Sequence, residues 1–263
     1  MIENFPIIAF ALLIAIAGGA IYFFRSRKRP VNNEEEAIDI SLLESNVLFY
    51  QNLSQDQKVQ FELDLRYFLS HTRITGVDTT VSALDRMLIA SAAVIPIFYF
   101  KEWRYQNLQE VLLYSDAINM DFETTGSAER NILGLVGTGS FEGKLLMSKH
   151  ALQNGFDNTT DKHNTAIHEF AHLIDKSDGE TDGIPNLLLD KTYVLPWLNL
   201  MHEQMQKIAN GKSDIHPYAY TNKAEFFAVT AEYFFERPEL LQKKHPELYE
   251  IFKEMFDTPA EIS

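Results

Sequence analysis

The stretch "NTAIHEFAHLID", residues 164–175, contains the motif His168-Glu169-x-x-His172. Residues four apart lie on one face of a helix, so both imidazoles can reach one metal ion about 2 Å away. Glu169 lies too far round the helix to bind the same ion easily, but its carboxylate can reach a metal-bound water and act as a general base. A zinc ion lowers the pKa of that water and polarises a carbonyl, which is the chemistry of amide hydrolysis.

The alternative is a solvated surface helix that happens to carry two histidines. The other residues of the stretch argue against it, because they are mostly apolar: Ala166, Ile167, Phe170, Ala171, Leu173 and Ile174. A helix of this kind is buried nearly all round, and buried His and Glu side chains are costly unless they have partners. The sequence therefore predicts a metal site on this helix.

A third metal ligand must come from outside the motif, because a catalytic zinc usually has three protein ligands. The chain has no cysteine, so this ligand must be His, Asp or Glu. Asp178 lies six residues after His172, the spacing of one zincin group. In that group a glycine permits a sharp turn, whereas Asp175 stands at its place here, which weakens this option.

Two glutamates in the segment "KAEFFAVTAEYFF" are the other candidates. Glu225 and Glu232 are seven residues apart and therefore share one face of a helix. Glu225 also fits a capping box with Asn222, in which its side chain would only cap the helix. We favour Glu225 over Glu232, although spacing alone does not decide between them.

The coarse pattern of the chain predicts an α+β fold, mostly helical with a small sheet. Apolar residues at helical spacing predict helices over 54–72, 82–100 with a break near Pro96, 160–175, 195–211, 222–238 and 239–256. Short apolar runs after polar or glycine-containing stretches predict strands within 107–116 and 143–152. Because the helices dominate and the strands are few, α+β is the expected class.

The N-terminus predicts a membrane anchor. Residues 5–24 form a run of 20 residues without a charge, long enough to span a bilayer as a helix, and "RSRKR" follows at once. Positive charge stays in the cytoplasm, so we expect the N-terminus outside and the body inside. The expected organisation is an anchor with its basic flank at 1–30, a polar linker at 31–45 and a zincin-like domain at 46–263. A cleaved signal peptide is less favoured because the basic residues follow the apolar run.

Composition and charge exclude other classes of protein. Hydrophobic residues make up 46% of the chain, which is typical of a globular protein. The net charge is −14, and residues 1–30 carry four basic residues against one acidic residue, so the body is more acidic still. A surface this acidic argues against direct nucleic-acid binding, which needs basic clusters.

The paired segments "HEFAHLID" and "PYAYTNKAEFFAVTAEYFFERPELL" resemble the Mlc titration factor A family of bacterial zinc peptidases. That family is similar to the gluzincins, including the catalytic domain of anthrax lethal factor. The resemblance runs from about residue 50 to the end of the chain and implies that Glu225 completes the zinc site. It also implies that Tyr218, seven residues earlier, stabilises the oxyanion of the tetrahedral intermediate, a suitable task for a phenol.

The expected function is therefore a zinc metallopeptidase with one Zn2+ per chain, acting on peptides or proteins. The resemblance implies aminopeptidase-type activity and binding of a glucose-responsive transcriptional repressor. The anchor places the chain in the bacterial inner membrane as a single-pass protein whose catalytic domain faces the cytoplasm. One alternative is a membrane-tethered regulatory protein in which zinc is structural or vestigial. Another is a zinc hydrolase with a non-peptide substrate.

Residues around the motif receive weaker expectations. Asp175 could orient a ligand histidine or form hydrogen bonds at the end of its helix. His163 and His216 could line the cleft, but a surface or structural role is favoured for each. In zincins the strand before the motif helix commonly offers an edge to the substrate backbone, so the strand in 143–152 could do so here.

Overall fold

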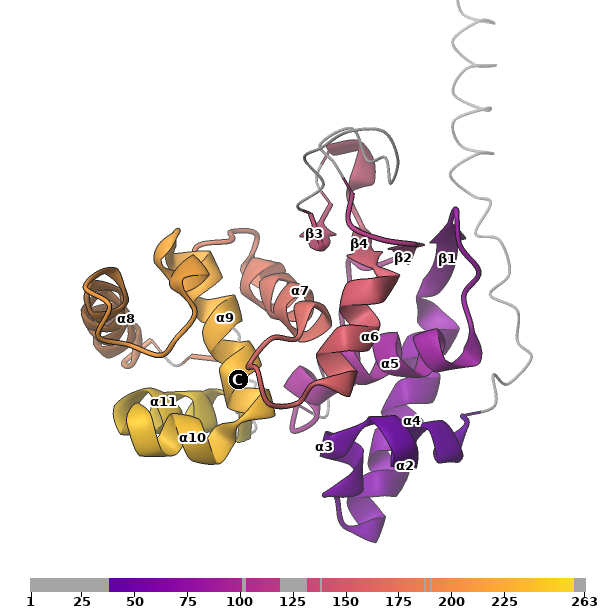
Figure 1. Ribbon diagram of the computed structural model, residues 1–263, viewed down its shortest axis with the longest axis horizontal. Coiled ribbons are helices and arrows are strands. Elements are labelled where there is room, and N and C mark those ends of the chain that lie inside the picture. Colours follow the sequence, from indigo (N-terminus) through magenta and orange to yellow (C-terminus); the bar gives the residue numbers. More distant parts are fainter. Residues whose placement is uncertain are drawn as a thin grey trace, which may run out of the picture. The chain divides into compact units, whose positions relative to one another are not determined.

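The computed structural model describes residues 38–100, 103–118, 132–137, 139–186, 188–189 and 191–257. These residues form a mostly helical domain with one small mixed sheet, and the predicted α+β class is confirmed (Figure 1). The predicted anchor at 5–24 lies outside these ranges. Among the helices of the described ranges, none combines the length and apolar character that crossing a bilayer requires.

The first part of the domain is helical and begins with α2 (Ile40–Asn46), α3 (Leu48–Gln51), α4 (Gln55–His71) and α5 (Ala83–Val94). Helix α2 occupies the last residues of the stretch interpreted as a linker. Capping boxes begin α4 at Ser54 and α5 at Ser82, since each serine accepts a hydrogen bond from the backbone three residues on. Pro96 lies in the 3₁₀ turn η1 (Ile95–Ile97), which ends α5 as predicted.

The sheet has four strands in the order β1 (Arg73–Val77), β2 (Glu110–Tyr114), β4 (Lys144–Ser148) and β3 (Gly134–Val136). Strands β1, β2 and β4 are parallel, and β3 pairs antiparallel with β4 at the edge. The predicted strand in 143–152 stops at Ser148, whose side chain accepts the Ala151 N–H at 3.2 Å and starts α6 (Lys149–Asp157). Strands β1 and β3 were not predicted.

The second part of the domain is helical throughout. After the motif helix α7 (Thr165–Asp175) come α8 (Val194–Ala209), α9 (Lys223–Glu236), α10 (Pro238–Lys244) and α11 (Pro246–Asp257). Three further 3₁₀ turns are η2 (Gly139–Phe141), η3 (Lys176–Asp178) and η4 (Pro217–Tyr220). Helix α8, predicted over 195–211, ends just before Gly211, which takes a positive φ of 65°.

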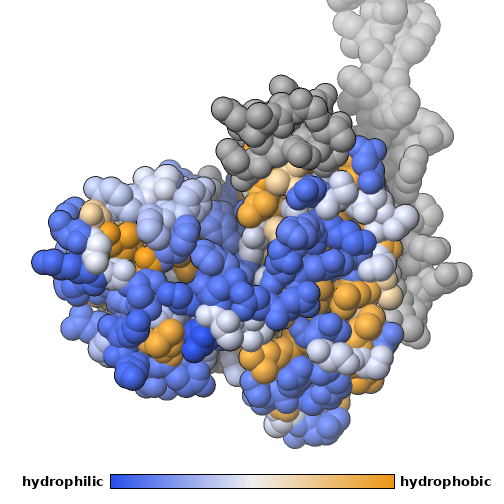
Figure 2. Space-filling model, in the orientation of Figure 1, coloured by the Kyte–Doolittle hydropathy of each residue, from blue (hydrophilic) through white to orange (hydrophobic). Residues whose placement is uncertain are grey.

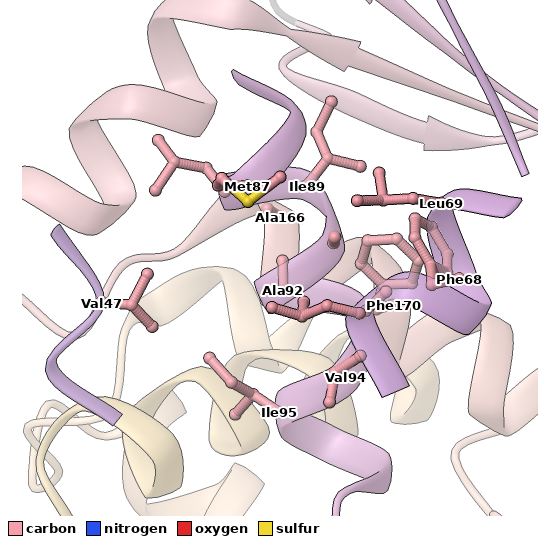
Figure 3. Packing of buried hydrophobic residues seen from close by; sticks show 14 of the residues in the cluster. Val47, Phe68, Leu69, Met87, Ile89, Ala92, Val94, Ile95, Ala166 and Phe170 are labelled. Atoms are coloured by element: carbon pink, nitrogen blue, oxygen red, sulfur yellow. The ribbon is translucent and has the colours of Figure 1, made fainter. Parts of the chain in front are cut away.

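Helix α7 lies between two hydrophobic cores, with β3 and β4 on one side and α9 on another (Figure 1). Ala166 and Phe170 pack with α4 and α5 in the first core (Figure 3). Ala171 and Ile174 pack in the second core with α8, α9 and α11. This double packing explains the apolar flanks of the motif and fixes the backbone that carries the histidines.

The outer surface shown in Figure 2 is mostly hydrophilic, with hydrophobic residues in separate small groups. This agrees with a chain whose apolar residues are largely used in the two cores.

Candidate metal centre

Helix α7 presents the two histidines of the motif on one face, with His168 near its first turn and His172 in its last turn. Asn164 caps the helix, because its side chain accepts the Ile167 N–H at 3.1 Å. The Nε2 atoms of His168 and His172 then lie 3.1 Å apart. Both side chains are largely buried, with exposed fractions of 11% and 12%. The predicted sharing of one helix face is therefore seen in the structure.

Helix α9 brings Glu225 to the same point. Its Oε2 lies 3.0 Å from His168 Nε2 and 3.4 Å from His172 Nε2. Asn222 caps the helix by accepting the Glu225 N–H at 2.9 Å, whereas the Glu225 carboxylate turns to the histidines. These three residues, which we call the ligand cluster, form a group compact enough to hold one metal ion.

Glu232 and Asp178, the other candidates for the third ligand, lie outside the ligand cluster. Glu232, two turns along α9, accepts from His168 Nδ1 at 2.6 Å and from the Asn164 N–H at 2.7 Å. It therefore holds the far side of the His168 ring rather than facing the ligand cluster. Asp178 is exposed and accepts hydrogen bonds from Glu180 N–H and from the Asn186 side chain, within its own loop.

Hydrogen bonds within the ligand cluster shift the pKa values of His168 and Glu225 in opposite directions. Burial would lower the pKa of His168, but hydrogen bonds to Glu225 and Glu232 outweigh it and raise the pKa to about 10. Burial would raise the pKa of Glu225, but hydrogen bonds from His168 and His172 outweigh it and lower the pKa to about 2. His168 and Glu225 thus stabilise each other's charged forms.

The Glu169 side chain lines the same cleft as the ligand cluster and lies against β3. Burial raises the pKa of its carboxyl, an effect partly offset by His168 and His172. Gly134 of β3 lies directly over it, since a Cβ at position 134 would stand 2.5 Å from Glu169 Cγ and 2.6 Å from Glu169 Oε1. The space for the Glu169 side chain therefore depends on a glycine in the neighbouring strand.

Tyr218 lies in η4 at the mouth of the site. Its side chain is half exposed, at 49%, and its ring centroid is 6.2 Å from that of His168. Partial burial raises the pKa of the Tyr218 phenol, and the carboxylates of Glu225 and Glu169 raise it further. The phenol consequently keeps its proton and remains a hydrogen-bond donor at neutral pH.

All these groups line one cleft of about 930 Å³. The lining residues include the segment 132–136, which contains β3, together with His163, His216 and Tyr218. His163 and His216 thus line the cleft, with ring centroids 4.5 Å apart. The expectation that the strand in 143–152 offers a free edge is wrong, because β4 lies between β2 and β3. Among the described strands, the one that lines the cleft and stands at the end of the sheet order is β3.

Asp175 ends α7 in a fully buried position. Its Oδ2 accepts the Gly183 N–H at 2.9 Å, so it fixes the loop after the helix. Burial raises the pKa of its carboxyl to about 6. Its Oδ1 and the Nδ1 of His172 are both buried without a hydrogen-bond partner. Hydrogen bonding at the helix end is therefore seen, and a hydrogen bond to His172 is not.

Sequence reasoning missed β3 and Gly134. The signal was present in "NILGLVG", residues 131–137, where apolar residues stand on both sides of a glycine. A three-residue strand is too short to show the alternation that identifies strands, and only the fold shows that the glycine lies over Glu169.

Comparison with known proteins gives a consistent assignment. A protein from Synechocystis sp., slr2042, is 28% identical over 87% of this chain and 85% of its own length. Mlc titration factor A of Pectobacterium atrosepticum is 29% identical over 72% of this chain and 74% of its own, and that of Escherichia fergusonii is 27% identical over 84% of each. The family model of the glucose-regulated metallo-peptidase M90 matches residues 23–257. The chain, with its His-Glu-x-x-His helix and facing Glu225, belongs to the glucose-regulated metallo-peptidase M90 family.

Proposed function

We propose that this protein is a zinc-dependent peptidase in which His168, His172 and Glu225 bind one zinc ion and Glu169 is the general base. The observation that carries the proposal is the convergence of three ligand atoms from α7 and α9 beside a separate buried carboxylate. A structural metal site needs the ligands alone, whereas hydrolysis also needs a base and an open face.

The geometry of the ligand cluster suits zinc. In a tetrahedral site, two ligand atoms that each lie about 2.0–2.1 Å from the zinc ion are about 3.3 Å from each other. The three ligand atoms are separated by 3.0, 3.1 and 3.4 Å. Two imidazoles with one carboxylate form the His₂Glu set of catalytic zinc, which leaves a fourth position for water or substrate.

When bound, zinc supplies a Lewis acid that polarises a carbonyl and acidifies water. Glu169 accepts the proton of the attacking water and passes it to the leaving amine, a role favoured by the raised pKa of its buried carboxyl. Tyr218 donates its hydroxyl hydrogen to the developing oxyanion from the mouth of the cleft. Glu232 holds His168 through Nδ1, so that Nε2 faces the metal position.

The substrate is a peptide in extended conformation lying along β3. This strand is at the edge of the sheet, lines the cleft and passes over Glu169. An extended peptide can add to such an edge through main-chain hydrogen bonds. Aminopeptidase-type activity is the expected form.

The location is proposed from the sequence. Residues 5–24 anchor the chain in the inner membrane, and the basic residues after them keep the domain on the cytoplasmic side.

A second candidate is a regulatory protein that binds a partner. The relatives named Mlc titration factor A support it, since their name associates them with Mlc, and this chain would then bind a transcriptional repressor. The buried base beside the ligand cluster favours the peptidase, because partner binding requires no such group.

The test compares the full-length wild type with Glu169→Gln. The change removes the base but none of the three ligands, so zinc content should stay at one per chain while peptide hydrolysis falls by about 10²–10⁴-fold. Hydrolysis equal to wild type would contradict the peptidase proposal. Partner capture that survives the change, together with a wild type that cleaves no peptide, would favour the regulatory candidate.

A further inference from the structure

The two histidines of the ligand cluster are supported unequally on their far sides. Nδ1 of His168 is held by Glu232 at 2.6 Å. Nδ1 of His172 is buried and has no hydrogen-bond partner. A carboxylate oxygen of Asp175, one turn further along α7, is also buried and without a partner.

Coordination determines which nitrogen of His172 carries the proton. Its Nε2 faces the ligand cluster, 3.1 Å from His168 Nε2. A neutral imidazole that gives the Nε2 lone pair to a metal must keep its proton on Nδ1. That N–H is buried, and a buried donor without an acceptor costs about 1–3 kcal/mol. The metal-bound form of His172 therefore needs an acceptor at Nδ1.

Asp175 is placed to be that acceptor. Residues three apart are neighbours on a helix face, so the Asp175 carboxylate lies on the same side of α7 as the His172 ring. Its other oxygen, Oδ2, already accepts the Gly183 N–H at 2.9 Å. This leaves Oδ1 as an unused acceptor, and among the buried polar atoms of the described residues only a few are unused in this way.

The loop at Gly183 holds the carboxylate in place. Gly183 has φ of +76°, and a Cβ there would stand 2.3 Å from the backbone oxygen of Lys223, at the start of the helix that carries Glu225. The Gly183 oxygen accepts the indole N–H of Trp197 at 2.7 Å. Asp175 therefore connects the second histidine with a loop that is packed against α9.

We propose that Asp175 is the positioning residue of His172. Its Oδ1 accepts the Nδ1–H when Nε2 binds the metal, as Glu232 does for His168. This inference rests on the proposed zinc site. It assigns the two ligand histidines separate carboxylate partners, one from α9 and one from α7 itself.

The test measures zinc affinity of the full-length chain by competition with a chelator, in wild type, Asp175→Asn and Asp175→Ala. Loss of a carboxylate that orients a ligand histidine weakens metal binding by about 10–100-fold, and we expect this for both variants. The absorption spectrum of the Co2+-loaded protein should also change, since the His172 ring is no longer oriented. Asp178→Asn, a loss of the same charge from the exposed loop three residues on, should change neither.

The outcomes separate this inference from the proposed function. Zinc affinity and Co2+ spectrum equal to wild type, with a lower melting temperature, would show that Asp175 only fixes the loop and would overturn the inference. A wild type that binds no zinc contradicts the proposed function as well. If the variants do not fold, proton NMR of the zinc-loaded wild type decides: a strongly hydrogen-bonded Nδ1–H of His172 is expected, and a freely exchanging one overturns the inference.

Discussion

Two groups of His and acidic side chains in this domain look similar in composition but differ in how their charges are met. One is the ligand cluster of His168, His172 and Glu225. The other, which we call the Asp214 cluster, joins the loop before η4 to α9 and α10. Asp214 accepts from His245 Nε2 at 2.8 Å, from the Tyr233 hydroxyl at 2.9 Å and from Lys244 Nζ at 3.0 Å. Lys162 adds a further ammonium group at 3.3 Å.

The Asp214 cluster is complete without any added ion. Two lysines and a histidine surround one carboxylate, and both carboxylate oxygens have donors. Burial would raise the pKa of Asp214, but hydrogen bonds from His245, Lys244 and Tyr233 outweigh it and hold the pKa far below its usual range. This pattern is typical of a structural ion-pair network.

The ligand cluster lacks such cations. It contains two imidazoles and a carboxylate, and the carboxylates of Glu232 and Glu169 are close by. Two unpaired buried atoms also lie beside it, on His172 and Asp175. A group of converging ligand atoms with further carboxylates close by is suited to a metal ion, whereas a carboxylate already surrounded by cations is not.

The largest expected effect of a single change is on metal binding by Glu225→Ala. One of the three proposed ligands is removed, so zinc affinity should fall on the order of 10³-fold. Competition with a chelator measures this in the full-length chain. Asp214→Asn is the matched control, since it removes one carboxylate charge from the other cluster and should leave zinc affinity unchanged. Unaltered affinity in Glu225→Ala would return the third-ligand role to Glu232 or Asp178.

A smaller effect is expected when Gly134→Ala crowds Glu169, the proposed base. The added methyl would stand 2.5 Å from Glu169 Cγ and must displace that side chain or β3. Misplacing a catalytic group by about 1 Å can cost about 10²-fold in rate, so we expect a loss of that order in peptide hydrolysis. Zinc affinity should stay near the wild-type value because no ligand is touched. Full activity in the variant would show that the space over Glu169 is not required.

The histidine motif and its helix could be predicted from sequence because their determinants are local. The Asn164 cap, the spacing of His168 and His172 and the apolar flanks all lie within twelve residues of the chain. The same holds for the serine caps of α4 and α5 and for the Gly211 stop of α8. Local rules of capping and periodicity are enough for such elements.

Other features depend on contacts between distant segments and could not be predicted. Glu232 supports His168 across 64 positions of sequence, and spacing could not distinguish it from Glu225. Gly134 looks like a loop glycine until β3 is placed over α7. The sequence suggested that β4 offers an edge to the substrate, but β4 lies between β2 and β3. Strand β3 comes before β4 in the sequence and lies beyond it in the sheet, and this order could not be predicted because it is a property of the fold.

The smallest expected effect is on folding, in Asp214→Asn. Hydrogen bonds from His245, Lys244 and Tyr233 to a charged group are lost or weakened, so the free energy of unfolding should fall by about 1–3 kcal/mol at pH 7. The native pKa of Asp214 is lowered, so the stabilisation is fully present above the unfolded value of about 3.9 and is lost as pH falls through the lower native pKa. The gap in the free energy of unfolding between wild type and variant should therefore close below about pH 4 in urea melts at several pH values.

Glu250→Gln, the loss of one exposed charge on α11, should leave stability nearly unchanged. A gap that persists unchanged in acid would mean that the Asp214 charge is not what stabilises this cluster, and the contrast with the ligand cluster would then rest on the zinc measurements.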